Sequence, residues 1–240
     1  MTLRSLTCFS LACIPPLWAA SVTGTVELAD SRDVAVSKAK DYSNVVAWLE
    51  PVRKDIVLPR PAPVSILQKN KRFTPHVIVV QSGTVVDFPN ADPIFHNAFS
   101  NFAGQPFDTG LYAPGTTQKI TFRREGVVRV FCNIHSNMSA VIVVTGSPYF
   151  ASTDRFGALR VANVPPGEYT VKYFHERAME STLKALERRI TVGSESVTLP
   201  PARISESGYL PQPHKNKHGA DYPPLPAGNT VYPGARTSGR

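Results

Sequence analysis

The chain has 240 residues, which is enough for one large or two small domains with a sizeable core. A hydrophobic content of 42% and a charged content of 18% exclude a disordered chain, and the 22 prolines favour strands joined by many turns over helices. The net charge of +8 comes from scattered Lys and Arg residues without a basic helix, so we expect an acidic partner or an anionic surface and not nucleic acid.

Residues 1–21 are typical of a secretory signal peptide. Arg4 supplies a positive start, residues 6–18 are mostly apolar, and small residues follow. Lipoprotein processing at Cys13 is an alternative. The stretch is too short to span a bilayer comfortably, and no later segment is long and apolar enough, so we expect an exported, periplasmic chain without a membrane span. Removal of the signal leaves Cys132 as the only thiol, either an inert buried group or a metal ligand.

Strand patterns dominate the remaining chain, in which apolar residues alternate with polar ones between turn-forming clusters. We expect strands at 22–28, 45–50, 76–80, 84–88, 118–122, 126–132, 140–145, 158–161, 169–174, 190–192 and 197–199. One helix is expected over 176–189. The prolines of 51–63 indicate a connector, and the polar, proline-rich and basic stretch 201–240 indicates a flexible tail.

Three side chains that can bind metal follow one another at intervals of three residues: Cys132, His135 and Met138. A strand leads into this segment and another leads out, so we expect a tight loop that aims all three at one point. Thiolate and imidazole suit zinc or copper, whereas thioether is the usual weak axial ligand of a blue-copper centre, whose other ligands are two His and one Cys. The segment therefore predicts copper and requires a second His from elsewhere.

Five other histidines can supply this second imidazole: His76, His96, His175, His214 and His218. His96 is the best candidate, because it lies just after a strong strand and can reach the same end of a sandwich as the Cys132 loop. His76 opens a strand and is the alternative ligand. The two tail histidines are four residues apart, but their surroundings are not helical, so we expect at most weak binding there.

Residues 64–146 resemble the cupredoxins, the blue-copper family of plastocyanin, azurin and amicyanin. The resemblance rests on His96 followed by Asn97 and on the Cys-x2-His-x2-Met loop, whose short spacing is closest to amicyanin. It implies a Greek-key β-sandwich that holds one type 1 copper ion. The implied ligands are two imidazoles, a thiolate and an axial thioether, from His96, His135, Cys132 and Met138. It also implies that Asn97 donates its backbone N–H to the Cys132 sulfur and ties the two ligand loops together.

This ligand set leaves no open position for a substrate, so we expect single-electron transfer and not an enzyme. Copper nitrite reductases and multicopper oxidases need further His-rich sites, and this chain has no His-x-His pair. Copper storage, delivery or sensing is the alternative function. In the family the His of the C-terminal loop reaches the surface as the electron exit, a role that falls here on His135. The implied partner is a redox protein of the cytochrome c or quinoprotein dehydrogenase class.

Residues 22–63 and 147–200 resemble two parts of a carboxypeptidase-regulatory-like, or transthyretin-like, sandwich. The Pro-Pro-Gly-Glu-Tyr turn at 165–169 is the most specific part of this match. The implied architecture is all-β, with a cupredoxin inserted into or packed beside a second sandwich that has a structural or adhesive role. Proteins of this combined type are often labelled methylamine-utilization-like.

Overall fold

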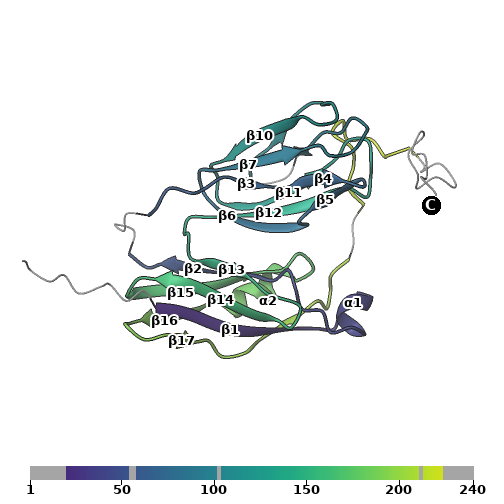
Figure 1. Cartoon of the computed structure of the whole chain (residues 1–240). Coiled ribbons are helices and arrows are strands. Elements are labelled where there is room, and N and C mark those ends of the chain that lie inside the picture. Colours follow the sequence, from purple (N-terminus) through teal and green to yellow (C-terminus); the bar gives the residue numbers. More distant parts are fainter. Residues whose placement is uncertain (1–19, 54–57, 102–103, 211–212, 224–240) are drawn as a thin grey trace, which may run out of the picture.

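The computed structural model describes residues 20–53, 58–101, 104–210 and 213–223. This part of the chain forms 18 strands and two short helices, which confirms the predicted all-β class. Figure 1 shows two bodies, one above the other. We call the lower body, residues 20–51 and 150–205, the outer sandwich, and the upper body, residues 64–145, the inner sandwich. In the described residues no helix is long and apolar enough to cross a membrane.

The outer sandwich consists of two sheets with an apolar core between them. In the first sheet β1 (Ala20–Ala29) pairs antiparallel with β14 (Ala158–Val164) and parallel with β17 (Val197–Thr198) and β18 (Ala202–Ser205). The second sheet has the order β13 (Phe150–Ser152), β2 (Val46–Pro51), β15 (Gly167–Phe174), β16 (Arg188–Val192). Val22 and Leu159 from the first sheet meet Leu49, Tyr169 and Val171 from the second, and all five are buried.

The inner sandwich lies in the chain between β2 and β13. Its larger sheet has the order β6 (Val77–Gln81), β12 (Ser139–Thr145), β11 (Gly126–Phe131), β8 (Phe99–Ser100), β9 (Phe107–Asp108). Its smaller sheet has the order β10 (Thr117–Phe122), β7 (Thr84–Pro89), β3 (Val64–Ser65), and a hairpin is formed by β4 (Leu67–Lys69) and β5 (Arg72–Thr74). Phe88 and Phe122 pack against Val128 and Ile142 in the core between the sheets.

The two sandwiches share an apolar contact. Val46 on β2 and Phe174 on β15 form one buried cluster with Val77 on β6 and Val141 and Val143 on β12. β12 is buried at six of its seven residues because both of its faces are covered, one by its own core and one by the neighbouring sandwich. The sheet of the inner sandwich that contains β6 and β12 therefore faces the outer sandwich.

The helix expected over 176–189 is shorter than predicted. The structure has α2 at Glu180–Ala185, and Arg188 already begins β16, where it pairs with Val171. Strand pairing with β15 therefore overrides the helical periodicity of the last residues. A further helix, α1 (Val34–Ser37), was not predicted; the carboxylate of Asp33 caps it by accepting the N–H of Ala35.

Two predicted boundaries differ from the structure. Residues 1–19 of the expected signal lie outside the described residues, but Ala20 and Ser21 are buried in β1, so the folded sheet begins before the predicted boundary. The tail predicted to be flexible from 201 contains β18, which pairs with β1, and residues 213–223 contact the inner sandwich through hydrogen bonds. Residues 224–240 lie outside the described part.

Candidate metal centre

Three of the four predicted ligands converge at one end of the inner sandwich. The Nδ1 atoms of His96 and His135 each lie 3.8 Å from the Sγ atom of Cys132. The three ligand atoms all lie within 4.8 Å of one another, and the two imidazole ring centroids are 5.0 Å apart. His96 and Cys132 are fully buried, whereas His135 is partly exposed. The structure therefore brings together the His, Cys and His predicted from separate loops.

The backbone explains why these side chains meet. Phe131 at the end of β11 pairs with Ser139 at the start of β12, so the ligand loop, residues 132–138, closes between two paired strands. Within it the Cys132 N–H donates to the Met138 carbonyl (3.1 Å) and the Met138 N–H donates to the His135 carbonyl (3.0 Å). On the other side His96 forms an antiparallel bridge with Tyr112, which holds it against the sandwich.

Met138, the fourth predicted ligand, is fully buried in the inner core. It belongs to the same cluster of buried residues as Cys132. Its backbone closes the ligand loop, and its thioether is the soft, weak donor that a copper site uses axially. Its place as a ligand remains a prediction.

The surroundings of Cys132 favour its thiolate form. Burial raises the pKa of the thiol, but the imidazoles of His135 and His96 and the backbone N–H groups of Asn97 and Ile134 lower it more, to about 5. Hydrogen bonds and nearby positive charge favour an anion in this way. At neutral pH the sulfur is therefore in the form that binds metals.

Asp92 fixes the orientation of His96. Its Oδ2 atom lies 2.8 Å from His96 Nε2, and both side chains are buried. The same carboxylate accepts the N–H groups of Asn70 (2.6 Å) and Lys71 (2.9 Å) in the β4–β5 turn. Burial lowers the pKa of His96, but the Cys132 sulfur and the Asp92 carboxylate raise it more, so the net pKa is raised. Nε2–H donates to Asp92 and Nδ1 is presented to the sulfur, as at carboxylate-supported metal histidines.

Asn97 connects the two ligand loops. Its Oδ1 atom accepts the N–H of Asn133 (2.7 Å), and its backbone N–H contributes to the low pKa of Cys132. The side chain of Asn97 therefore connects the two ligand loops, as expected. Its Nδ2 atom also donates to Asp108 on β9 (3.3 Å), which extends the connection to the edge of the sheet.

Three large apolar side chains that are next to residues of the site in the sequence are exposed. Ile134 precedes His135, Phe95 precedes His96, and Leu111 precedes Tyr112; these three side chains are 44%, 55% and 59% exposed. The ligands His96 and Cys132 are thus buried, whereas these apolar neighbours in the sequence are accessible to solvent.

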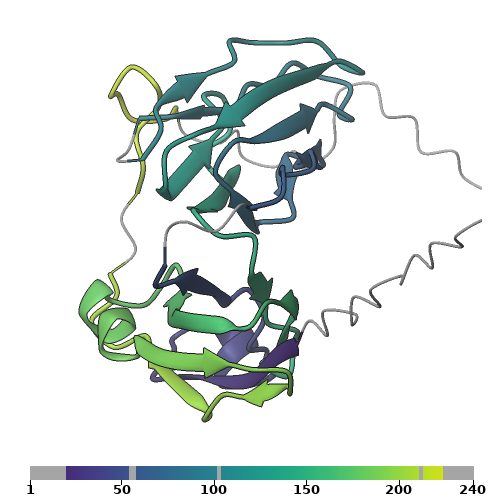
Figure 2. The ribbon, with the colours of Figure 1, turned by 90° about the vertical axis from the view of Figure 1, so that its left-hand side faces the viewer.

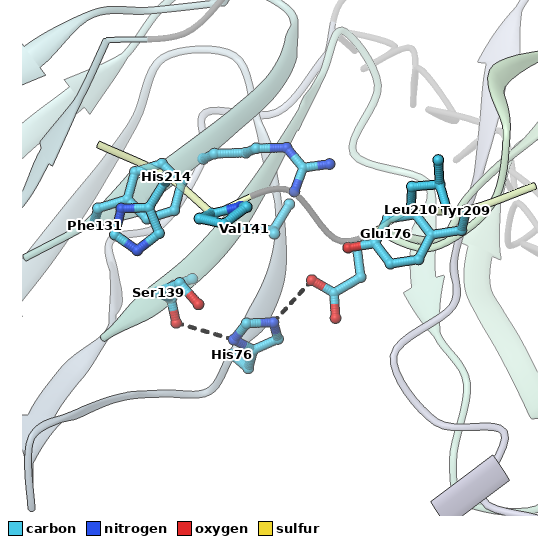
Figure 3. A pocket seen from close by; sticks show the side chains of 11 residues that line it. His76, Phe131, Ser139, Val141, Glu176, Tyr209, Leu210 and His214 are labelled. Atoms are coloured by element: carbon cyan, nitrogen blue, oxygen red, sulfur yellow. Dashed lines mark hydrogen bonds and ion pairs between the residues drawn. The ribbon is translucent and has the colours of Figure 1, made fainter. Parts of the chain in front are cut away.

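The other candidate histidines lie elsewhere. His76, the alternative ligand, donates from Nδ1 to the Ser139 carbonyl (3.0 Å) and from Nε2 to the Glu176 carboxylate (2.9 Å), in a pocket of about 370 Å³ between the sandwiches (Figure 3). His175 pairs with Glu206 in the outer sandwich, and His214 stacks on Phe131. Within the described part of the chain, none of these belongs to the His96–Cys132–His135 cluster.

Sequence reasoning missed Asp92 and the β4–β5 turn that holds it. The available signal was the spacing: Asp92 precedes His96 by four residues. In the turn itself, Asn70 and Lys71 both have a positive φ of 56°. Neither residue is glycine, so the sequence offers no clear signal for this backbone conformation. The contact depends on two loops meeting in space, so spacing along the chain is a weak guide to it.

Neither a protein-family model nor a curated protein matches the sequence. Among solved structures, a Cu-containing nitrite reductase from Thermus scotoductus SA-01 is 29% identical, with a TM-score of 0.34, over 40% of this chain and 25% of that chain. A purple cupredoxin from Nitrosopumilus maritimus is 23% identical, with a TM-score of 0.32, over 34% of this chain and 99% of its own. Amicyanin from Paracoccus versutus is 17% identical, with a TM-score of 0.33, over 40% and 97%. This chain thus spans a quarter of the length of the nitrite reductase.

Proposed function

We propose that the chain binds one type 1 (blue) copper ion with His96, Cys132, His135 and Met138 and uses it for single-electron transfer. The supporting observation is the arrangement of donors: the Cys132 sulfur lies 3.8 Å from an imidazole nitrogen of each of two histidines from separate loops. Three donors of these types that approach each other so closely are suited to a metal ion.

The donor types select copper over zinc. A thiolate, two imidazoles and a buried thioether match a blue-copper set, whereas zinc sites do not use thioether. When bound, copper supplies a one-electron couple between its two common oxidation states. The chain's own residues supply the stiffness: Asp92 orients His96, and Asn97 ties its loop to Asn133. Ligands held in this way change position little between the two states.

The partly exposed His135 supports its role as the electron exit. The exposed apolar side chains of Phe95, Leu111 and Ile134, each next to a residue of the site in the sequence, support docking of a redox partner at this end of the inner sandwich. We propose a partner of the cytochrome c or quinoprotein dehydrogenase class, with an acidic character that matches the net charge of +8. The buried ligand set supports a carrier and not an enzyme.

We further propose that the chain is exported to the periplasm by a signal within its first residues. The outer sandwich then belongs to the carboxypeptidase-regulatory-like, or transthyretin-like, type, and the whole chain to the proteins labelled methylamine-utilization-like. A structural role suits the outer sandwich, because it packs against the inner one through the cluster around Val141.

Copper storage, delivery or sensing is the second candidate function. It is favoured by the combination of thiolate and thioether, because these soft donors hold copper(I) well. The complete burial of Cys132 and Met138 also suits an ion that is retained.

Absorption and electron-paramagnetic-resonance spectra of the mature chain with copper test the proposal. An intense blue thiolate-to-copper band with narrow hyperfine splitting supports electron transfer, and a colourless protein that holds only copper(I) supports storage or delivery. Cys132→Ser should abolish the blue band, and a band that survives this change would contradict the ligand assignment. His76→Ala is the control, and the band should remain.

A further inference from the structure

A segment near the C-terminus lies directly on the ligand loop. We call residues 213–223 the C-terminal strap. Figures 1 and 2 show it in yellow against one end of the inner sandwich, although the preceding strand, β18, belongs to the outer sandwich. The composition of this segment predicts flexibility, yet three of its residues make specific contacts with the loop or with groups that support it.

Tyr222 contacts the thiolate ligand's own backbone. Its hydroxyl donates a hydrogen bond to the Cys132 carbonyl oxygen at 2.8 Å. This carbonyl belongs to the residue that supplies the predicted thiolate ligand, so the hydrogen bond fixes the start of the ligand loop.

His214 contacts the loop at a second point. Its Nε2 atom donates to the Ser136 carbonyl at 2.8 Å, next to the ligand His135. Its ring stacks on Phe131, with centroids 3.8 Å apart and an interplanar angle of 21° (Figure 3). Phe131 is the last residue of β11, so the stack fixes the place where the ligand loop begins.

Lys217 supplies the third contact. Its backbone N–H donates to Asn133 Oδ1 at 3.0 Å, and its ammonium pairs with Asp108 at 2.7 Å. Asn133 is the residue whose N–H is held by Asn97, and Asp108 accepts a hydrogen bond from Asn97. The strap therefore joins the group of side chains that connects the two ligand loops.

We propose that the strap is a fixed part of the metal centre, in which Tyr222, His214 and Lys217 are positioning residues that hold the ligand loop closed and retain the ion. This inference rests on the proposed function. The physical reason is that the loop lies between β11 and β12 and leaves the carbonyls of Cys132 and Ser136 to find partners outside the ladder. The strap supplies those partners, so opening the loop requires either lifting the strap or leaving polar groups without bonds.

The strap also makes the site depend on both sandwiches. The strap follows β18 in the sequence, and β18 is hydrogen-bonded to β1 in the outer sandwich. Near its other end, Tyr222 is hydrogen-bonded to the ligand loop of the inner sandwich. A tether fixed at one end keeps the other end at a high local concentration near its binding surface. The strap therefore rebinds readily after each opening and shortens the time that the loop spends open.

The sharpest variant is Tyr222→Phe, which removes only the hydroxyl. Its matched control is Tyr209→Phe, because Tyr209 lies in the same C-terminal stretch and its hydroxyl has no hydrogen bond among the described residues. Two rates are measured: alkylation of Cys132 by iodoacetamide in the copper-free protein, and loss of copper(I) to bathocuproine disulfonate in the loaded protein. We expect both rates to rise about fivefold in Tyr222→Phe, the factor typical of one hydrogen bond, and to be unchanged in the control.

The second variant is His214→Ala, with His218→Ala as its control. His218 lies in the same strap and is exposed, and within the described part of the chain its imidazole makes no hydrogen bond, ion pair or ring stack. His214→Ala should raise both rates by at least as much as Tyr222→Phe, since it removes a hydrogen bond and a stacked ring. His214→Asn, which keeps a donor but not the ring, should restore part of the loss.

The two readouts separate this proposal from the proposed function. If the protein binds no copper but the alkylation rate still rises in Tyr222→Phe, the copper function fails and the strap stands. If copper binds with a blue band but neither rate changes in Tyr222→Phe or His214→Ala, the strap proposal is overturned. Circular dichroism of each variant shows that the sandwiches are folded during the measurement.

Discussion

Two buried histidine–carboxylate pairs, one in each sandwich, have almost the same geometry and different surroundings. In the inner sandwich His96 Nε2 lies 2.8 Å from Asp92, and in the outer sandwich His175 Nε2 lies 2.9 Å from Glu206. All four side chains are at most 3% exposed. The difference lies in what the carboxylate and the second ring nitrogen contact.

In the outer pair the carboxylate is neutralised. Arg177 donates two hydrogen bonds to Glu206 (2.9 and 3.0 Å), and Ser31 donates a third (2.6 Å). The Nδ1 atom of His175 is buried without a hydrogen-bond partner in the described residues, and burial, ahead of the charge of Arg177, lowers the pKa of His175. This histidine is part of a closed ionic cluster that stabilises the fold.

In the inner pair the second ring nitrogen of the histidine faces a third side chain. Asp92 is held by two backbone N–H groups, and the Nδ1 atom of His96 faces the Cys132 sulfur. The net pKa of His96 is raised, opposite to that of His175. A buried histidine–carboxylate pair therefore becomes a candidate site when its second nitrogen meets a further donor, and not through burial or pairing alone.

The largest expected effect concerns stability in the outer pair. Glu206→Gln removes the buried carboxylate that accepts hydrogen bonds from Arg177, Ser31 and His175, so the free energy of unfolding should fall by about 3 kcal/mol. Arg177 keeps its ion pairs with Asp33 and Glu176. Urea unfolding measures the loss. Glu195→Gln changes an exposed glutamate and should have no effect. A loss as small as that of the control would show that the ionic cluster contributes nothing to stability.

The next effect concerns metal affinity in the inner pair. Asp92→Asn removes the negative charge that orients His96, so the affinity for copper(I) should fall by about 10- to 100-fold. Competition with a chromophoric chelator measures it. Glu206→Gln is the matched control, because it makes the same change beside the other buried histidine and should leave the affinity unchanged. Equal affinities in wild type and Asp92→Asn would contradict the role of Asp92.

The smallest effect concerns a third pair, His76–Glu176, which joins the two sandwiches and is 40% and 21% exposed. The hydrogen bond that His76 donates to Glu176, together with the charge of Glu176, raises the pKa of His76, although burial and Arg177 oppose it. Burial raises the pKa of Glu176, but His76 and Arg177 lower it more. Each group thus favours its charged form in the folded chain.

The sign of the pH dependence follows from these two directions. The contribution of His76 is full below its unfolded pKa of about 6.5 and is lost as the pH rises through the higher folded pKa. That of Glu176 is full above about pH 4.3 and is lost as the pH falls through the lower folded pKa. Because solvent screens the pair, the difference between wild type and His76→Gln should be about 0.5 kcal/mol at pH 5.5 and smaller at pH 8.5. Urea unfolding at both pH values measures it, and a larger difference at pH 8.5 would contradict the prediction.

The ligand loop could be predicted because its chemistry is local. Cys132, His135 and Met138 stand together in the sequence between two strand patterns, and the closing strands carry the loop to one end of a sandwich. His96 could be predicted as a ligand for a similar reason, since it follows the strong strand pattern of β7. Alternation of apolar residues likewise indicated β1 and β7, and a continuous apolar run indicated β12; in these strands packing and local preference agree.

The supporting contacts could not be predicted because they join segments distant in the sequence. Asp92 binds the β4–β5 turn about twenty residues earlier, and Tyr222 binds a carbonyl 90 residues before it. The polar, proline-rich composition of the strap is that of a free tail, and a few hydrogen bonds and one stacked ring outweigh that tendency. The composition of a segment describes its average behaviour and does not predict contacts made by single side chains.

The insertion of the inner sandwich between β2 and β13 has a consequence for biosynthesis. During translation the inner sandwich is complete before β13–β18 leave the ribosome, so it can fold first. Its folding brings the ends of the insertion together, where Trp48 on β2 pairs with Phe150 on β13, and thus lowers the entropic cost of closing the outer sandwich. β1, by contrast, pairs among the described residues with β14, β17 and β18, all of which are synthesised after the inner sandwich. β1 is therefore among the last strands to be protected against aggregation, although it is synthesised before the inner sandwich.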